Sequence, residues 1–306
     1  MKKTLKHLTV ALVLIFALVL SYSLTARLSK EDTVFSFIVT VDMRQYAGPK
    51  YHSSQYFQGT CEAIREVGKG SFMVSPGDID PPQYVFDMIK KILGEEYAWY
   101  PVVGNHEAET PEDMVWLRDW GSGEIPNLVL RGPENGEETT YSFDFEHAHF
   151  VALNEYYDGK SDIGTDGDIS EPLYNWLEND LAANKKPFVF VFGHEPIVSI
   201  PDFDNGRHRH KGDNLDAYPE NSQRFQELLR KYGVMAYICG HTHNFSYAKI
   251  NGIWQIDAGH CRGIAETGAR STFLKIIVGK NSCRVEVYRD DSKGEEYALT
   301  NTIMLD

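Results

Sequence analysis

Residues 234–243 read VMAYICGHTH, an apolar run that ends at Gly240 and is followed by the pair His241 and His243. A short apolar run of this kind predicts a buried strand, and the glycine predicts a turn at its end. Two imidazoles two residues apart on such a turn reach neighbouring points in space, and neutral imidazole is the commonest metal-binding side chain at physiological pH. The stretch therefore predicts a buried strand with metal-binding side chains at its carboxyl end.

Four other stretches have the same order of apolar strand and ligand-type residue. They end in Asp42 (after 34–41), Gly77-Asp78 (after 71–76), Gly104-Asn105-His106-Glu107 (after 99–103) and Gly193-His194 (after 188–192). Because ligands bind at the carboxyl ends of strands in open α/β sheets, we expect these turns to meet the histidine pair at one edge. Together they predict a single polar cluster that forms a metal site.

The chemical type of the donors narrows the choice of metal. The six candidate ligands are Asp42, Asp78, Asn105, His194, His241 and His243. They offer oxygen and nitrogen atoms and no thiolate, which suits manganese, iron, zinc or cobalt and argues against a structural zinc held by cysteines. Six donors are too many for one tetrahedral zinc and suit two metals that share a carboxylate. Two metals about 3.5–4 Å apart are the usual arrangement for in-line attack at phosphorus.

The order Asp, Gly-Asp, Gly-Asn-His-Glu, Gly-His and Gly-His-x-His across residues 34–260 resembles that of the calcineurin-like metallophosphoesterases. The resemblance implies an α/β fold of four layers, with two packed mixed β-sheets flanked by helices. It implies an enzyme that hydrolyses phosphate mono- or diesters by attack of metal-bound hydroxide on a phosphorylated small-molecule or ester substrate. Its cofactors would be two divalent or trivalent ions of manganese, iron or zinc.

The same resemblance implies a role for each motif residue. Asp78 would bridge the metals, with Asp42 and His243 on one of them. The other metal would be held by Asn105, His194 and His241. His106 would lie outside the metal shell, contact the phosphate and protonate the leaving group, and Glu107 could orient His106 through its second ring nitrogen.

Two positions depart from the family pattern. The residue two after the first aspartate, a histidine ligand in the family, is Arg44, and the residue three after the bridging aspartate is Pro81. A guanidinium cannot bind a metal, so water, His52 or a nearby oxygen replaces the donor, or that position binds weakly. Arg44 could instead clamp the phosphate with its planar fork, or only pair with an acidic neighbour such as Asp80. These departures leave open an alternative function, a metal- or phosphoryl-binding protein that has lost catalysis.

Composition agrees with one folded domain over residues 33–306. The 306 residues are 42% hydrophobic, and no Pro/Gly/Ser-rich linker divides them. The net charge of −14 argues against binding nucleic acid through a basic surface, which needs clustered lysine and arginine. Residues 207–211, RHRHK, are a basic cluster in this acidic chain. They form either a mobile loop that draws in an anionic substrate or a solvated loop without a role.

The first 26 residues are interpreted as a signal peptide or N-terminal anchor. Lysines at positions 2, 3 and 6 precede an apolar run at residues 8–20, and cleavage is expected after Ser23. No charge occurs at residues 8–26, so this stretch could also remain as a membrane tether. Either interpretation places the catalytic part in the periplasm or outside the cell.

Sequence periodicity also predicts the secondary structure. We expect helices at 54–67, 83–93, 111–120, 172–183 and 219–232, a hairpin at 139–154, and strands at 246–250, 253–258, 272–278 and 283–289. His147 and His149 flank the hairpin turn and are expected to be exposed, whereas His260 could reach the site. Cys239 is expected to be a buried thiol, and Cys261 and Cys283 are close enough in the chain to pair across neighbouring strands.

Overall fold

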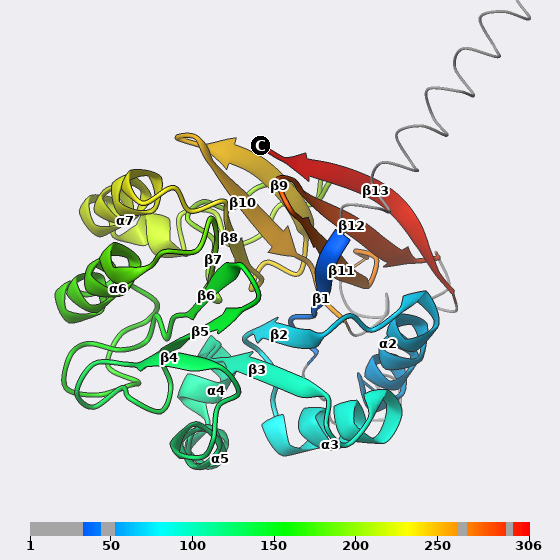
Figure 1. Cartoon of the computed structure of the whole chain (residues 1–306), viewed down its shortest axis with the longest axis horizontal. Helices are drawn as coiled ribbons and strands as arrows, with labels where there is room; N and C mark the ends of the chain where they lie inside the picture. The colour runs from blue at the N-terminus through cyan, green and yellow to red at the C-terminus, as the bar shows by residue number, and fades with distance from the viewer. Residues whose placement is uncertain (1–32, 44–52, 262–267, 292–295) are drawn as a thin grey trace, which may run out of the picture.

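The computed structural model describes residues 33–43, 53–261, 268–291 and 296–306, which form two β-sheets (Figure 1). The first contains β1 (Thr33–Val39), β2 (Phe72–Pro76), β3 (Ala98–Val102), β11 (Thr272–Gly279), β12 (Cys283–Asp290) and β13 (Tyr297–Leu305), in the order β13-β12-β11-β1-β2-β3. The second contains β4 (Leu128–Arg131), β5 (Tyr141–Phe145), β6 (Ala148–Ala152), β7 (Phe188–Phe192), β8 (Ala236–Cys239), β9 (Phe245–Ile250) and β10 (Ile253–Ala258), in the order β4-β5-β6-β7-β8-β10-β9. Both sheets are mixed, with parallel centres at β1-β2-β3 and β6-β7-β8-β10.

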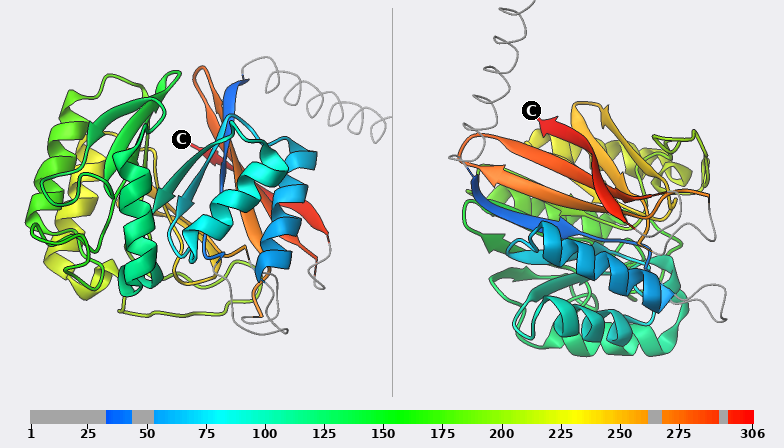
Figure 2. Two further views of the ribbon diagram at one scale, coloured as in Figure 1. Left: turned by 90° about the horizontal axis from the view of Figure 1, so that it is seen from below. Right: turned by 90° about the vertical axis from the view of Figure 1, so that its right-hand side faces the viewer.

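Helices cover the outer face of each sheet, so the chain forms four layers (Figure 2). The first sheet packs against α2 (Ser53–Val67), α3 (Pro82–Leu93) and α5 (Pro111–Ser122). The second packs against α6 (Glu171–Ala183) and α7 (Pro219–Lys231). Two short helices, α4 (Asn105–Glu109) and η1 (Leu215–Ala217), lie in the connections. The predicted α/β fold of two packed mixed sheets flanked by helices is confirmed.

Aromatic rings fill much of the space between the sheets. Phe37 of β1 and Phe72 of β2 stack with their ring centroids 5.2 Å apart, and Phe150 of β6 meets the Phe72 ring edge-on at 5.2 Å. The next residue of β1, Ile38, faces the helices on the other side of the sheet. Because both faces of the central strands are buried, their sequences are continuous apolar runs, which is why they could be recognised from the sequence.

The predicted helices and strands are present close to their predicted bounds. The sequence contained no clear signal for β4 and β13, which lie at sheet edges. Most of β13 is exposed or half-buried, and its polar centre, Thr300-Asn301-Thr302, has the composition of a loop. Pairing with β12, rather than local periodicity, makes this segment a strand.

Cys261 and Cys283 do not form a disulfide, and all four cysteines are buried free thiols. The thiol of Cys261 donates to the carbonyl oxygen of Thr272 at the start of β11, at 3.0 Å. Cys283 pairs with Val278, near the other end of β11. The length of a strand therefore separates the two sulfurs. The prediction of a buried free thiol at Cys239 is confirmed.

The prediction that both hairpin histidines are exposed is wrong. His149 is 1% exposed, with Nδ1 2.8 Å from Oδ1 of Asp144 and Nε2 2.8 Å from Oδ2 of Asp180. His147 is half-buried, with Nε2 2.8 Å from the carbonyl oxygen of Gly279. Strand periodicity could not show that α6 covers this face of the hairpin and brings Asp180 to it.

The buried ring of His149 makes stability depend on pH. Carboxylates only accept hydrogen bonds, so a ring bonded to both carries a proton on each nitrogen. Burial lowers the pKa of His149, but the hydrogen bonds and charges of Asp180 and Asp144 outweigh burial and raise the pKa above its usual value. A raised folded-state pKa stabilises the fold fully below the unfolded value of about 6.5, and this stabilisation is lost as the pH rises through the folded value.

We therefore expect the free energy of unfolding to fall more steeply above about pH 6.5 in the wild type than in a His149→Gln variant. Urea titrations from about pH 5 to about pH 9 measure both slopes. An Asn175→Gln variant at an exposed position of α6, which changes no ionisable group, is the control and should keep the wild-type slope. Equal slopes for the wild type and His149→Gln would contradict the assignment.

Candidate metal centre

The carboxyl ends of five strands deliver the predicted ligands to one edge of the sandwich. Asp42 follows β1, Asp78 follows β2, Asn105 begins α4 after β3, His194 follows β7, and His241 and His243 follow β8. Ligand-type atoms of Asp42, Asp78 and His194 lie within 4.8 Å of one another, and all three residues are buried. The structure thus brings together the side chains that the sequence motifs predict.

Asn105, His194 and His241 form one tight group. Oδ1 of Asn105 is 3.2 Å from both Nε2 of His194 and Nδ1 of His241, and these two nitrogens are 3.3 Å apart. Nε2 of His194 is also 3.3 Å from Oδ1 of Asp78. The other ring nitrogen of His194, Nδ1, is 2.8 Å from the carbonyl oxygen of Pro76. Because a carbonyl only accepts, Nδ1 carries the proton and Nε2 turns its lone pair toward the group.

This convergence of lone pairs fits a metal ion. Oδ1 of Asp78, Oδ1 of Asn105 and Nε2 of His194 are all acceptors, and acceptors held this close are unfavourable unless a cation lies between them. Burial raises the pKa of Asp78 well above its usual value, and the charge of Asp42 raises that pKa further. A bound cation would relieve both effects, because it stabilises the charged carboxylates.

Asp42 and His243 form a second group beside the first. Nε2 of His243 is 3.3 Å from Oδ1 of Asp42, whose Oδ2 accepts a hydrogen bond of 2.9 Å from the backbone amide of His241. The carboxylate of Asp78 is within reach of both groups, as a bridging ligand has to be. The arrangement fits the predicted distribution of ligands.

The turns that carry these ligands have an uncommon backbone conformation. The φ angle is 51° at Asp42, 51° at Asp78, 68° at His241 and 58° at His243. Non-glycine residues rarely adopt this left-handed region, and such residues concentrate at functional sites, where the surrounding structure holds the strain. The glycines of these turns are needed because they lie against the ligands. A Cβ on Gly104 would lie 2.3 Å from the amide nitrogen of Asp78 and 2.6 Å from its Oδ1.

A Gly104→Ala variant is therefore expected to displace Asp78 and weaken metal binding about 10–100-fold, the range found when groups that support ligands are changed. Equilibrium dialysis followed by elemental analysis measures the affinity. The matched control is Gly59→Ala in α2, because a Cβ at Gly59 meets nothing within 4 Å. Unchanged affinity in Gly104→Ala would show that the turn can relax without moving the carboxylate.

Glu107 has different contacts from the predicted ones. It is fully buried, and its carboxylate accepts hydrogen bonds from the amides of Gly104 (2.7 Å), Asp78 (3.0 Å) and Ile79 (2.8 Å). It therefore ties the turn after β2 to the turn after β3, rather than orienting the ring of His106. Burial raises the pKa of Glu107, and the charge of Asp78 raises it further.

His106 lies beside the bridging carboxylate and partly faces solvent, with 28% of its side chain exposed. Its backbone amide donates to Oδ1 of Asp78 at 3.2 Å, and its Nε2 is 3.6 Å from Oδ2 of Asp78. On the other side of the ring, Nδ1 is 3.7 Å from Oε2 of Glu109. Arg44 and His52 lie outside the described residues, so the phosphate clamp and the replacement ligand stay predictions.

Glu155 is a supporting residue that the motif analysis missed. Its buried carboxylate accepts hydrogen bonds from the amides of His194 (2.8 Å) and Glu195 (2.7 Å) and from the hydroxyl of Tyr237. Burial raises the pKa of Glu155 to about 7 although these hydrogen bonds lower it. Residues 148–155 repeat the pattern of apolar strand followed by polar residues, and this signal could have identified Glu155.

The basic segment 207–211 packs against two of the candidate metal ligands, so the alternative of a freely solvated loop does not describe it. Nη1 of Arg209 is 2.5 Å from Nδ1 of His243, and the rings of His210 and His241 have centroids 4.2 Å apart. His260 is fully buried, with its ring centroid 6.1 Å from that of His243. His260 therefore lies beside the candidate ligand His243, and its reach to a bound metal stays a prediction.

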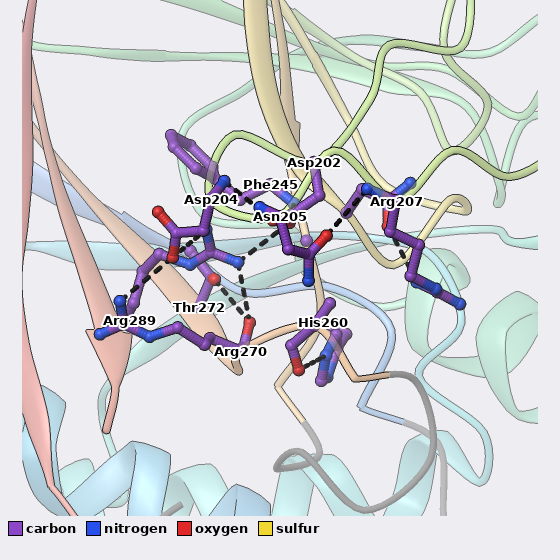
Figure 3. A network of polar contacts seen from close by, with 12 residues as sticks. Asp202, Asp204, Asn205, Arg207, Phe245, His260, Arg270, Thr272 and Arg289 are labelled. Carbon is purple, nitrogen blue, oxygen red and sulfur yellow. Dashed lines mark hydrogen bonds and ion pairs between the residues drawn. The ribbon is translucent and has the colours of Figure 1, made fainter. Parts of the chain in front are cut away.

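A network of ion pairs, buried at Arg289 and Asp202 and partly exposed at Asp204 and Arg270, anchors the chain just before this segment (Figure 3). The guanidinium of Arg289, 1% exposed, contacts Oδ2 of Asp202 and Oδ2 of Asp204 at 3.0 Å each, and Arg270 contacts Asp204 at 3.1 Å. Oδ2 of Asp202 also accepts a hydrogen bond of 3.0 Å from the amide of Phe245. The network therefore joins residues 202–211 to β12 and to the start of β9, directly after the histidine turn.

The fold and the buried Asp-Asp-His cluster define an α/β protein with a site that suits a metal ion, and comparisons with known proteins identify its family. The sequence profile of the calcineurin-like phosphoesterases matches residues 48–245. Tartrate-resistant acid phosphatase type 5 of Mus musculus is 37% identical over 244 residues, which are 73% of this chain and 71% of that protein. The protein of the same name from Rattus norvegicus is 24% identical over 269 residues, 81% of this chain and 79% of that protein.

Among solved structures, PhoD has a similar fold, with a TM-score of 0.58 at 11% identity over 90% of this chain and 70% of that one. The chain belongs to the calcineurin-like phosphoesterase family and is a metal-dependent phosphoric ester hydrolase that acts on a phosphorylated substrate. The resemblance inferred from the order of the motifs is confirmed.

Proposed function

We propose that the chain is an exported phosphoesterase with a dinuclear metal site. The observation that carries this proposal is the convergence of acceptor atoms from Asp78, Asn105 and His194 beside the partly exposed imidazole of His106. A site built only to hold a metal has no need of an ionisable group in this position.

Each ligand has a place in this proposal. Asp42 and His243 would hold one metal, and Asp78 would bridge to a second metal held by Asn105, His194 and His241. Manganese, iron and zinc suit these oxygen and nitrogen donors. When bound, the two ions would supply a nucleophile at neutral pH and neutralise charge on the phosphate oxygens.

His106 would donate the proton that the leaving alcohol needs. The hydrogen bond from its backbone amide to Asp78 fixes the start of α4, and its ring lies at the edge of the ligand cluster with access to solvent. A general acid has to be within hydrogen-bond reach of the leaving oxygen and able to exchange its proton with water. The position of the ring beside Asp78 and its exposure to solvent support this role.

A His106→Ala variant is expected to lose about 10²–10⁴-fold in turnover while it keeps its metal content. The loss should be larger for an alkyl phosphate than for a nitrophenyl phosphate, because an alkoxide needs the proton more than a nitrophenolate does. Steady-state kinetics with both substrates and elemental analysis of the same sample measure these effects. The contrasting variant is His194→Ala, which should lose metal and turnover together. A loss in His106→Ala that is equal for both substrates would exclude the role of general acid.

The proposed function is tested by elemental analysis of the purified protein together with hydrolysis of aryl phosphate mono- and diesters. We expect two metals per chain and turnover that is lost on chelation and restored by manganese, zinc or iron. The faster of the two ester classes identifies the reaction type. Bound metal without turnover of either ester would instead indicate a binding protein that kept the scaffold and lost catalysis.

Export is supported by the layout of residues 1–26, which lie outside the described residues. Within the described part of the chain, no helix is both long and apolar enough to cross a bilayer. Expression of the full chain in a bacterial host, followed by fractionation and N-terminal sequencing, tests this prediction. We expect protein that begins after Ser23 outside the cytoplasm. Uncut chain in the membrane fraction would support a tether through residues 8–26, and uncut chain in the cytosol would contradict export.

A further inference from the structure

The cleft beside the metal centre has an acidic wall. It has a volume of about 440 Å³ and includes the ligands Asn105 and His241 in its lining. The acidic wall consists of the exposed carboxylates of Glu109, Asp166 and Asp213. Glu195 also lines the cleft, but burial raises its pKa to about 9, so it is neutral near pH 7. Of the described residues that line the cleft, none is a lysine or an arginine. A bare phosphate ion would gain nothing from such a wall, whereas a positive charge elsewhere in a substrate would be attracted to it.

The acidic wall begins where the leaving alcohol would depart. Oε2 of Glu109 is 3.7 Å from Nδ1 of His106, the proposed proton donor. With the phosphate of an ester on the metal ligands, the proposed proton transfer from His106 would place the alcohol portion beside this ring and next to the wall. Glu109, Asp166 and Asp213 are exposed, so they can approach the alcohol portion without prior desolvation.

The wall offers a substrate carboxylates and not an open aromatic face. Tyr156 lines the cleft, is 2% exposed, and donates a hydrogen bond of 3.1 Å from its hydroxyl to Oε1 of Glu195. Because this ring is covered, an ammonium group would meet the exposed carboxylates and not the ring face that a cation–π contact needs. A further metal ion fits less well. Among the described residues, the wall does not bring three ligand atoms as close together as Asp42, Asp78 and His194 do.

From this geometry we infer that the cleft selects phosphate esters of positively charged alcohols, and that small amino alcohols are the class it fits. The inference rests on the proposed function, because it assigns the alcohol side of the same site. The metal ligands would take the phosphate, and the acidic wall would take the ammonium group. A substrate with one charge of each sign would thus be oriented with its ester bond beside His106.

Two esters of equal length test this selectivity. O-phosphoethanolamine and 2-hydroxyethyl phosphate differ only in an ammonium group and a hydroxyl group. For the metal-loaded wild-type protein at low ionic strength, we expect kcat/KM to be at least about tenfold higher for the amino ester. This ratio should fall as salt is added, because exposed charges are screened over about 10 Å at 0.1 M.

The variant that removes the effect is Asp166→Asn combined with Asp213→Asn, which should bring the ratio of the two kcat/KM values close to one. The matched control is Glu95→Gln combined with Glu96→Gln, which removes the same charge from the exposed turn between α3 and β3, at the opposite end of β3 from the site. The control should keep the wild-type ratio.

An equal kcat/KM for both esters in the wild type would overturn the inference and leave the proposed function standing. Failure of the metal-loaded protein to hydrolyse any ester, aryl phosphates included, would overturn both.

Discussion

At the common edge of the two sheets, Nε2 of His194 lies 3.3 Å from Oδ1 of Asp78 and 3.2 Å from Oδ1 of Asn105, so that three acceptor atoms converge. A buried polar group without a partner costs about 1–3 kcal/mol, and a buried carboxylate costs more. The rest of the fold has to hold these groups in place against that cost. The aromatic core between the sheets provides the necessary rigidity, because close-packed interiors deform little. The packing beneath the site thus holds the ligand atoms in positions that suit bound cations.

The turns that carry the ligands depend on a second set of buried carboxylates. Neither Glu107 nor Glu155 is among the predicted metal ligands. Glu107 accepts hydrogen bonds from backbone amides of two turns of the site, and Glu155 accepts them from two neighbouring amides of a third turn. Such bonds satisfy backbone amides that the left-handed conformations remove from regular pairing. The strained backbone at Asp78 is therefore held by Glu107, and the turn of His194 by Glu155, two side chains whose chemistry resembles that of ligands but whose role is structural.

Charge is distributed unequally around the metal centre. Arg209 and His210 pack on the histidine turn, and the ion pairs of Arg289 and Arg270 anchor the chain just before their segment. The cleft wall, in contrast, carries carboxyl groups. Burial raises the pKa of Glu195, the deepest of them, to about 9, and the neighbouring charges of Glu155 and Asp213 raise it further. Glu195 is therefore neutral near pH 7, and the charge of the wall comes from its exposed carboxylates. A substrate in the cleft meets both the metal ligands and these carboxylates, an arrangement that can orient a molecule with charges of both signs.

The sequence by itself determined the buried strands, the helices between them and the six candidate ligands, because each strand is a continuous apolar run that ends in a turn of glycine and polar residues. This local pattern needs no knowledge of distant segments. Only the tertiary structure decided the positions of residues whose partners are remote in the chain. Glu107 looked like the partner of His106 and is bound to backbone amides. His149 looked exposed until α6 brought Asp180 to it, and β13 became a strand only by pairing with β12. Local periodicity records which face of an element is apolar, whereas the packing of distant elements decides what lies against that face.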